Sequence, residues 1–176
     1  MPNIHPLIVH FPIALIIVIM IMDFLGVLSR RQSFISTANI LTIFAAVGAA
    51  VAVVSGLIAE ESVWRPGEAN DLIELHETVG LAVLGMTLIS LIFRLTVKKN
   101  KSGWPGWMAV ILSLIASALV GYGGYIGGEM VYKYGTGVRQ AEIATAKADS
   151  LSALHLNTET ENIFKEEAEG QNKLDY

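Results

Sequence analysis

Three histidines near the starts of apolar segments are the residues best suited to bind a cofactor. His5 and His10 lie at the start of the first apolar segment, and His76 lies near the start of the third. A histidine at bilayer depth is costly to bury unless it has a partner, so each is a candidate site residue. His10 stands about four residues into its predicted helix and His76 about five, so we expect the two imidazoles at nearly equal depth.

An imidazole pair on facing helices is the ligand set of a bis-histidine b-type haem, in which the axial ligands help to set the redox potential. Ala14 and Gly80 follow His10 and His76 by one helical turn, and these small residues leave space beside the rings. The spacing therefore predicts a haem b with His10 and His76 as axial ligands of the iron. The corresponding function is electron transfer in a membrane.

His5 is the weaker ligand candidate, because it precedes Pro6 at the expected lipid–water boundary, where solvation is cheap. In this position it can bond a haem propionate or cap the helix. If His76 is not a ligand, His5 and His10 become the next pair to consider.

Two other interpretations of the same residues stay open. In one, the histidines bind zinc or another divalent metal together with a carboxylate, for which Glu77 and Glu129 are available. In the other, no cofactor is bound. His10 then bonds a carbonyl that Pro12 leaves without a donor, and His76 pairs with Glu60 or Glu61.

Composition places the chain among membrane proteins. Apolar residues make up 53% of it, charged residues 16%, and the mean hydropathy is +0.54. Since the chain contains no cysteine, it cannot supply disulfides, thiolate metal sites or covalent haem attachment.

Other functional classes find little support in the sequence. No nucleophile-elbow pattern surrounds a serine or threonine, and no Walker loop is present. A net charge of −4 disfavours nucleic-acid binding. An accessory or electron-transfer protein is therefore favoured over a stand-alone enzyme.

Four apolar segments are long enough to cross a hydrocarbon core of roughly 30 Å. They cover about 6–28, 38–58, 72–97 and 105–132. The first has no basic residue before Arg30, so we expect it to be retained rather than cleaved as a signal peptide. The predicted fold is an all-α integral membrane four-helix bundle. Asp23 and Arg94 can form an ion pair within it, although Arg94 can equally reach the interface.

Loop charge predicts the orientation. Arg30, Arg31 and three lysines follow the first and third segments, whereas the loop at 59–71 is mostly acidic. By the positive-inside rule both termini lie outside the cytoplasm, in a multi-pass protein of the bacterial inner membrane. The predicted division is a transmembrane domain at 1–138 and an external polar tail at 139–176, helical from about Gln140 to Leu154 and then flexible.

Two patches carry a family resemblance. The first is His5-Pro6 followed by Val9-His10-Phe11-Pro12-Ile13-Ala14-Leu15, and the second is Gly127-Gly128-Glu129-Met130-Val131-Tyr132 leading into Gly135-Thr136-Gly137-Val138. Both resemble the DUF2231 family of bacterial membrane proteins, and they bracket residues 3 to 138. The resemblance implies a small multi-helix membrane domain that some relatives join to cytochrome c or Rieske modules.

Two functions follow from the sequence as hypotheses. In the first, the chain is a b-type haem domain that exchanges electrons with an external redox protein or a quinone near the outer surface. In the second, it is a non-catalytic scaffold whose small-residue helix faces bind neighbouring membrane chains or further copies of itself.

Overall fold

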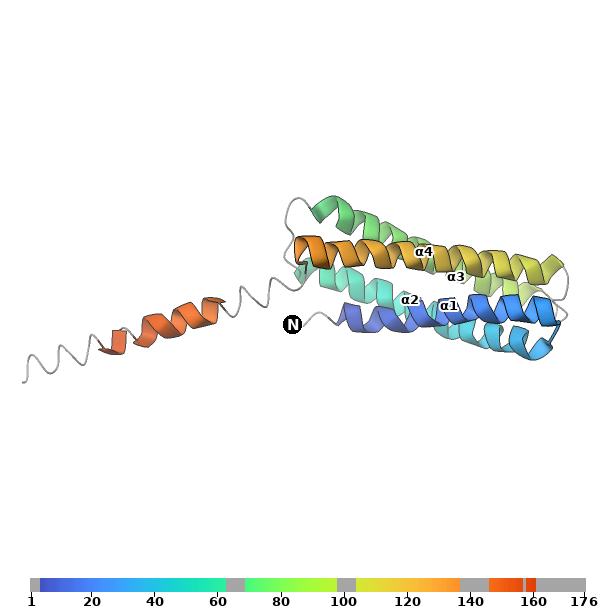
Figure 1. Cartoon of the computed structure of the whole chain (residues 1–176), viewed down its shortest axis with the longest axis horizontal. Coiled ribbons are helices and arrows are strands. Elements are labelled where there is room, and N and C mark those ends of the chain that lie inside the picture. Colours follow the sequence, from blue (N-terminus) through green and yellow to red (C-terminus); the bar gives the residue numbers. More distant parts are fainter. Residues whose placement is uncertain (1–3, 63–68, 98–103, 137–145, 157, 161–176) are drawn as a thin grey trace, which may run out of the picture. The chain divides into compact units, whose positions relative to one another are not determined.

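The structure is a computed structural model that describes residues 4–62, 69–97, 104–136, 146–156 and 158–160. Its first 136 residues contain four long helices (Figure 1). These are α1 (His5–Ser29), α2 (Gln32–Ser62), α3 (Asn70–Thr96) and α4 (Trp104–Tyr134). No strand occurs among the described residues, and the all-α prediction is confirmed.

A proline in the first turn and a left-handed residue after the last turn mark the two ends of helix α1. Proline occupies its first turn, where a missing backbone donor is harmless, and the buried Pro12 is accommodated inside the helix. At the other end Arg30 takes a left-handed conformation with φ of 55°, after which α2 starts at Gln32. Gly26 makes this tight turn possible, since a Cβ there would lie 2.8 Å from Cγ1 of Ile35. Helix α2 therefore begins earlier than the predicted residue 38.

The four helices form a ring in which α1 packs on α2 and α4, and α3 packs on the same two helices. Helices α1 and α3 are thus diagonal partners, and both start at the end of the bundle where α4 finishes (Figure 1). Small buried residues let the backbones approach closely along the axis, as membrane helix packing requires. They include Ala38, Ala45, Ala49 and Ala116.

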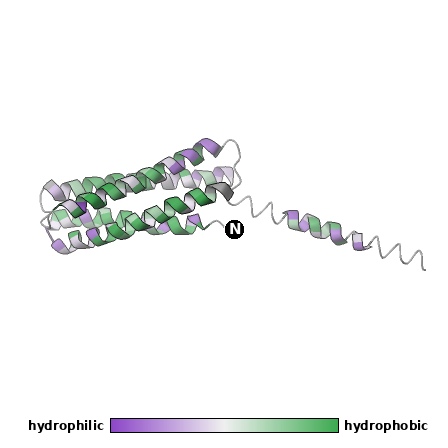
Figure 2. Cartoon of the chain, turned by 180° about the vertical axis from the view of Figure 1, so that it is seen from behind, coloured by the Kyte–Doolittle hydropathy of each residue, from purple (hydrophilic) through white to green (hydrophobic). Residues whose placement is uncertain are grey.

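The outer surface of the bundle is apolar. Figure 2 shows hydrophobic residues covering the middle of the helices. Large side chains such as Leu7, Phe44 and Leu95 are exposed along the helices. All four helices are long and apolar enough to cross a membrane. A lipid bilayer is the environment that solvates such a surface, so the chain is a membrane-spanning four-helix bundle.

The pattern of buried positions in α1 and α2 recurs in α3 and α4 at an offset of 71 residues. Asp23 and Arg94 are separated by the same number of residues. Buried positions of α1 and α2 fall on buried positions of α3 and α4 at this offset. The pairs are Ile16/Thr87, Ile19/Ser90, Asp23/Arg94, Ala38/Ala109, Thr42/Ser113, Ala45/Ala116 and Ala49/Val120. The α1–α2 hairpin and the α3–α4 hairpin therefore present matching faces to the bundle axis.

Residues 137–176 form a separate unit. Within this unit, residues 146–156 are helical, and the predicted helix start at Gln140 lies outside the described residues.

Candidate functional site

His5 and His76 meet at the end of the bundle where α1 and α3 begin. Their ring centres are 6.5 Å apart and the ring planes are nearly perpendicular, at 89°. Because α1 and α3 are diagonal, the two imidazoles approach across the bundle rather than along one helix interface. Both side chains are half-buried.

Each imidazole packs against a glycine of the following helix. A Cβ on Gly56 of α2 would lie 3.0 Å from Cε1 of His5, and a Cβ on Gly127 of α4 would lie 3.3 Å from Cε1 of His76. Gly56 and Gly127 are again 71 residues apart, as are His5 and His76. The four helices thus contribute one layer in which two histidines and two glycines alternate around the axis.

The two rings differ in their hydrogen bonds. Nδ1 of His5 lies 2.9 Å from Oγ of Ser55, which in turn donates to the carbonyl of Ala52. Nδ1 of His76 is buried and has no hydrogen-bond partner among the described residues. A buried nitrogen without a hydrogen-bond partner is available to a ligand, so His76 is a ligand candidate. Ser55 was not among the predicted site residues.

His10 lies elsewhere, so the structure does not bring the predicted pair of His10 and His76 together. His10 is exposed on α1, where its Nδ1 bonds within its own helix, to the carbonyl of Pro6. That carbonyl is one turn back and is not the carbonyl of Ile8, which Pro12 leaves without its helical donor. Five residues turn a helix by about 140° beyond a full rotation, so His5 and His10 cannot share the face toward His76. The structure brings His76 together with His5 instead.

The remaining predicted site residues do not gather around the histidines. Ala14 is exposed, and Glu77 is half-buried. Glu129 forms an ion pair with Lys133 at 3.1 Å on the surface of α4. Gly80, one turn after His76, borders open space, since no atom lies within 4 Å of a Cβ built there.

The ligands predicted for a bare metal ion do not lie close together. Among the described residues, no group of three His, Asp or Glu side chains is close enough to hold a metal ion. The predicted combination of His5, His10 and His76 with Glu77 or Glu129 is therefore not assembled. The side chains of Glu60 and Glu61, proposed as partners of His76, lie outside the described part of the chain.

A buried ion pair joins the same two helices at the opposite end of the bundle. Arg94 of α3 makes a two-pronged contact with the carboxylate of Asp23 of α1, with Nη1 to Oδ1 at 3.0 Å. Both side chains are almost completely buried. Arg94 also donates to Oγ of Ser90 at 3.2 Å and to Oδ1 of Asn39 at 3.2 Å. Of the two alternatives left open for Arg94, the structure contains the ion pair with Asp23.

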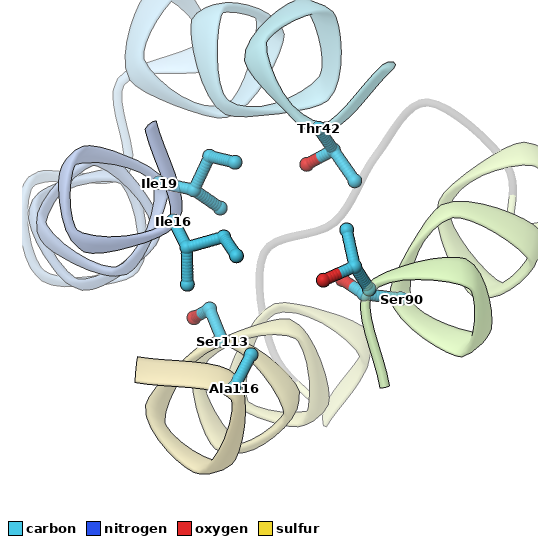
Figure 3. Close-up of a pocket in the computed structure, with 7 residues that line it drawn as sticks. Ile16, Ile19, Thr42, Ser90, Ser113 and Ala116 are labelled. Atoms are coloured by element: carbon cyan, nitrogen blue, oxygen red, sulfur yellow. The ribbon is translucent and has the colours of Figure 1, made fainter. Parts of the chain in front are cut away.

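Between the two polar ends lies a small cavity lined by all four helices (Figure 3). Its volume is about 10 Å³, and its walls are formed by Ile16, Ile19, Thr42, Thr87, Ser90, Ser113 and Ala116. The hydroxyls of Thr42 and Thr87 donate to carbonyls of their own helices, each at 2.7 Å. The centre of the bundle is therefore well packed, and the described helices leave no chamber of cofactor size at this level.

These features define a membrane four-helix protein with a histidine pair at one end of its axis and a buried ion pair at the other. Residues 1–140 match the family model described as "Predicted membrane protein (DUF2231)", so the chain belongs to the DUF2231 family. Searches of curated proteins and of solved structures gave no significant match.

Proposed function

We propose that this chain is a membrane electron-transfer domain in which His5 and His76 are the axial ligands of one b-type haem. The observation that carries the proposal is the approach of two equivalent imidazoles across the bundle, with ring centres 6.5 Å apart. Two imidazoles that each bind one ion at about 2.0 Å hold their ring centres about 6 Å apart. The separation thus suits two ligands on opposite sides of a single metal centre.

The number of ligands favours haem over a bare metal ion. A structural zinc ion takes four ligands from the protein, and a catalytic one takes three. Haem supplies its own in-plane nitrogens, so the protein needs to contribute only the axial ligands. A site with two imidazoles and no third ligand among the described residues matches the second requirement.

The surroundings of the two rings also fit haem ligation. Ser55 engages Nδ1 of His5, and such an outer contact orients a ligating imidazole. The glycines at positions 56 and 127 let the rings lie deep against α2 and α4. Helices α2 and α4 pack closely against the two rings at Gly56 and Gly127, so seating a porphyrin between the rings requires the two hairpins to separate at the histidine end. Gly80 borders open space beside His76 and gives this end room to adjust.

Haem would supply one-electron chemistry, and the chain would hold and orient it. In the proposed topology both termini lie outside the cytoplasm in the bacterial inner membrane, which puts the histidine layer near the outer surface. An external redox protein or a quinone is the corresponding electron-exchange partner.

A second candidate function is that of a non-catalytic scaffold, and the outer face of α4 favours it. Gly121, Gly124 and Gly128 all border open space, with no atom within 4 Å of a Cβ built at any of them. Small residues on a lipid-facing helix permit close contact with another membrane helix. The scaffold would bind a neighbouring membrane chain or a second copy of this one.

The test is a visible absorption spectrum of the protein purified in a mild detergent, recorded oxidised and after dithionite reduction. The proposal expects a low-spin haem b spectrum and a haem content near one per chain. Metal analysis of the same sample separates haem iron from a bare ion. A sample from haem-replete cells that contains neither haem nor metal rejects the proposal and favours the scaffold.

A further inference from the structure

The two hairpins present corresponding buried positions to their shared interface. Identical residues recur at the offset of 71 on the axis, among them His5/His76, Ala38/Ala109, Ala45/Ala116 and Gly56/Gly127. The contacts recur as well, because each histidine packs on the glycine of its own hairpin. An interface built this way would suit two identical hairpins as well as two different ones.

Equivalence breaks at the buried charges. Asp23 and Arg94 occupy matching positions with opposite sign. The surroundings of the two charges also differ. Ser90 and Asn39 both accept hydrogen bonds from Arg94. Their counterparts at the offset of 71 are the buried apolar residues Ile19 and Val110. One hairpin thus carries the acid and the other carries the base, and the polar partners of the base are not duplicated.

This difference in charge determines which hairpins can pack together. If two α1–α2 hairpins packed together through this face, two Asp23 carboxylates would meet on the axis. If two α3–α4 hairpins did so, two Arg94 guanidinium groups would meet there. Like charges buried in a low-dielectric interior repel strongly, and neither would be neutralised by a partner. Only the mixed pairing satisfies both charges.

We propose that the Asp23–Arg94 pair makes the hairpin interface selective, so that an α1–α2 hairpin accepts an α3–α4 hairpin and rejects the α1–α2 hairpin of a second copy of this chain. The pair is therefore a recognition element as well as a stabilising contact. This inference concerns the interface alone and holds whether or not the histidine layer binds haem.

The first experiment exchanges the charged site between the hairpins in the full chain. Asp23→Arg and Arg94→Asp alone each place like charges on the axis, and we expect at least a several-fold loss of monomeric protein extracted from membranes. The exchange variant combines both with Ile19→Ser, Ser90→Ile, Asn39→Val and Val110→Asn, which moves the whole set across the axis. We expect it to recover at least half of the wild-type yield of monomer. If the exchange variant is no better than the single variants, the two hairpins are not equivalent and the proposal fails.

The second experiment measures pairing between copies. The chain has no cysteine, so Ile16→Cys introduces one thiol on the axis of the α1–α2 hairpin. In this background we expect little disulfide-linked dimer on oxidation in membranes. Adding Asp23→Leu and Arg94→Leu removes the charge selection, and we expect the linked dimer to rise at least several-fold. Ile43→Cys, which puts the thiol at an exposed position of α2, is the matched control and should not respond. An unchanged dimer fraction in the Ile16→Cys background would overturn the proposed selectivity.

Discussion

His5 and His76 face each other from diagonal helices, with ring centres 6.5 Å apart, although a whole helical hairpin separates them in sequence. The two hairpins run in the same direction, so each ring reaches the axis from the first turns of its helix. The two imidazoles can therefore bind a shared centre although α1 and α3 are not packed neighbours in the ring of helices.

Replacement of either histidine is expected to remove the low-spin haem spectrum. His5→Ala and His76→Ala each delete one axial ligand, so the iron becomes five-coordinate or the haem is lost. The reduced-minus-oxidised spectrum measures this change. His10→Ala is the matched control, since His10 is exposed and bonds within its own helix. A wild-type spectrum in His5→Ala, with loss in His10→Ala, would contradict the assignment.

The glycine positions predict a graded effect. Gly56→Ala places a methyl group 3.0 Å from the His5 ring, and Gly127→Ala places one 3.3 Å from the His76 ring. We expect Gly56→Ala to shift its ring more and to lower haem occupancy more, with a loss of about 1–3 kcal/mol in the free energy of unfolding. Gly121→Ala fills open space and should be neutral or stabilising by about 0.5–1 kcal/mol. Denaturation in mixed detergent micelles measures these differences, and equal effects at all three positions would contradict the proposed packing of the histidine layer.

The sequence was sufficient for the fold because bilayer length and apolar composition are local properties. It predicted four spanning helices and offered the ion pair between Asp23 and Arg94 as one of two alternatives for Arg94, and the structure contains the helices and the pair. The boundaries were less well predicted. The sequence predicted that the second helix starts at about residue 38, after a polar loop. Helix α2 begins at Gln32 instead, because the left-handed Arg30 and the small Gly26 allow a shorter turn.

The predicted pairing of His10 with His76 considered depth without helix rotation, and the structure places His5 opposite His76. His10 and His76 match in depth, but His5 is the histidine that shares the interior face with the other members of its layer. A signal for this was present in the sequence. The spacing from His5 to His76 equals that from Gly56 to Gly127 and from Asp23 to Arg94. The missing hydrogen-bond partner of the His76 Nδ1 is a packing property, and no spacing could have revealed it.

The ion pair should be far more sensitive to the loss of one partner than to the loss of both. Arg94→Ala leaves a buried carboxylate without a counter-charge, and we expect a loss of about 3–5 kcal/mol in the free energy of unfolding. The combined Asp23→Leu and Arg94→Met change removes both charges and keeps apolar volume, so its loss should be smaller than that of Arg94→Ala. Unfolding in mixed micelles gives both values. Both variants lose the hydrogen bonds from Arg94 to Ser90 and Asn39, so a double variant less stable than Arg94→Ala would contradict the view that the unpaired carboxylate causes the loss.

Thiol labelling in intact cells tests the proposed orientation, and the absence of native cysteine makes the background clean. Ser33 and Asn70 are both exposed and lie near opposite ends of the bundle, at the starts of α2 and α3. In the proposed orientation Ser33 lies on the cytoplasmic side, so Ser33→Cys should be shielded from a membrane-impermeant reagent, whereas Asn70→Cys should react. Both should react once the membrane is permeabilised, which controls for accessibility of the thiols. The reverse pattern in intact cells would put the histidine layer on the cytoplasmic side, and its electron-exchange partner would then have to be a cytoplasmic protein or a quinone reached from that face.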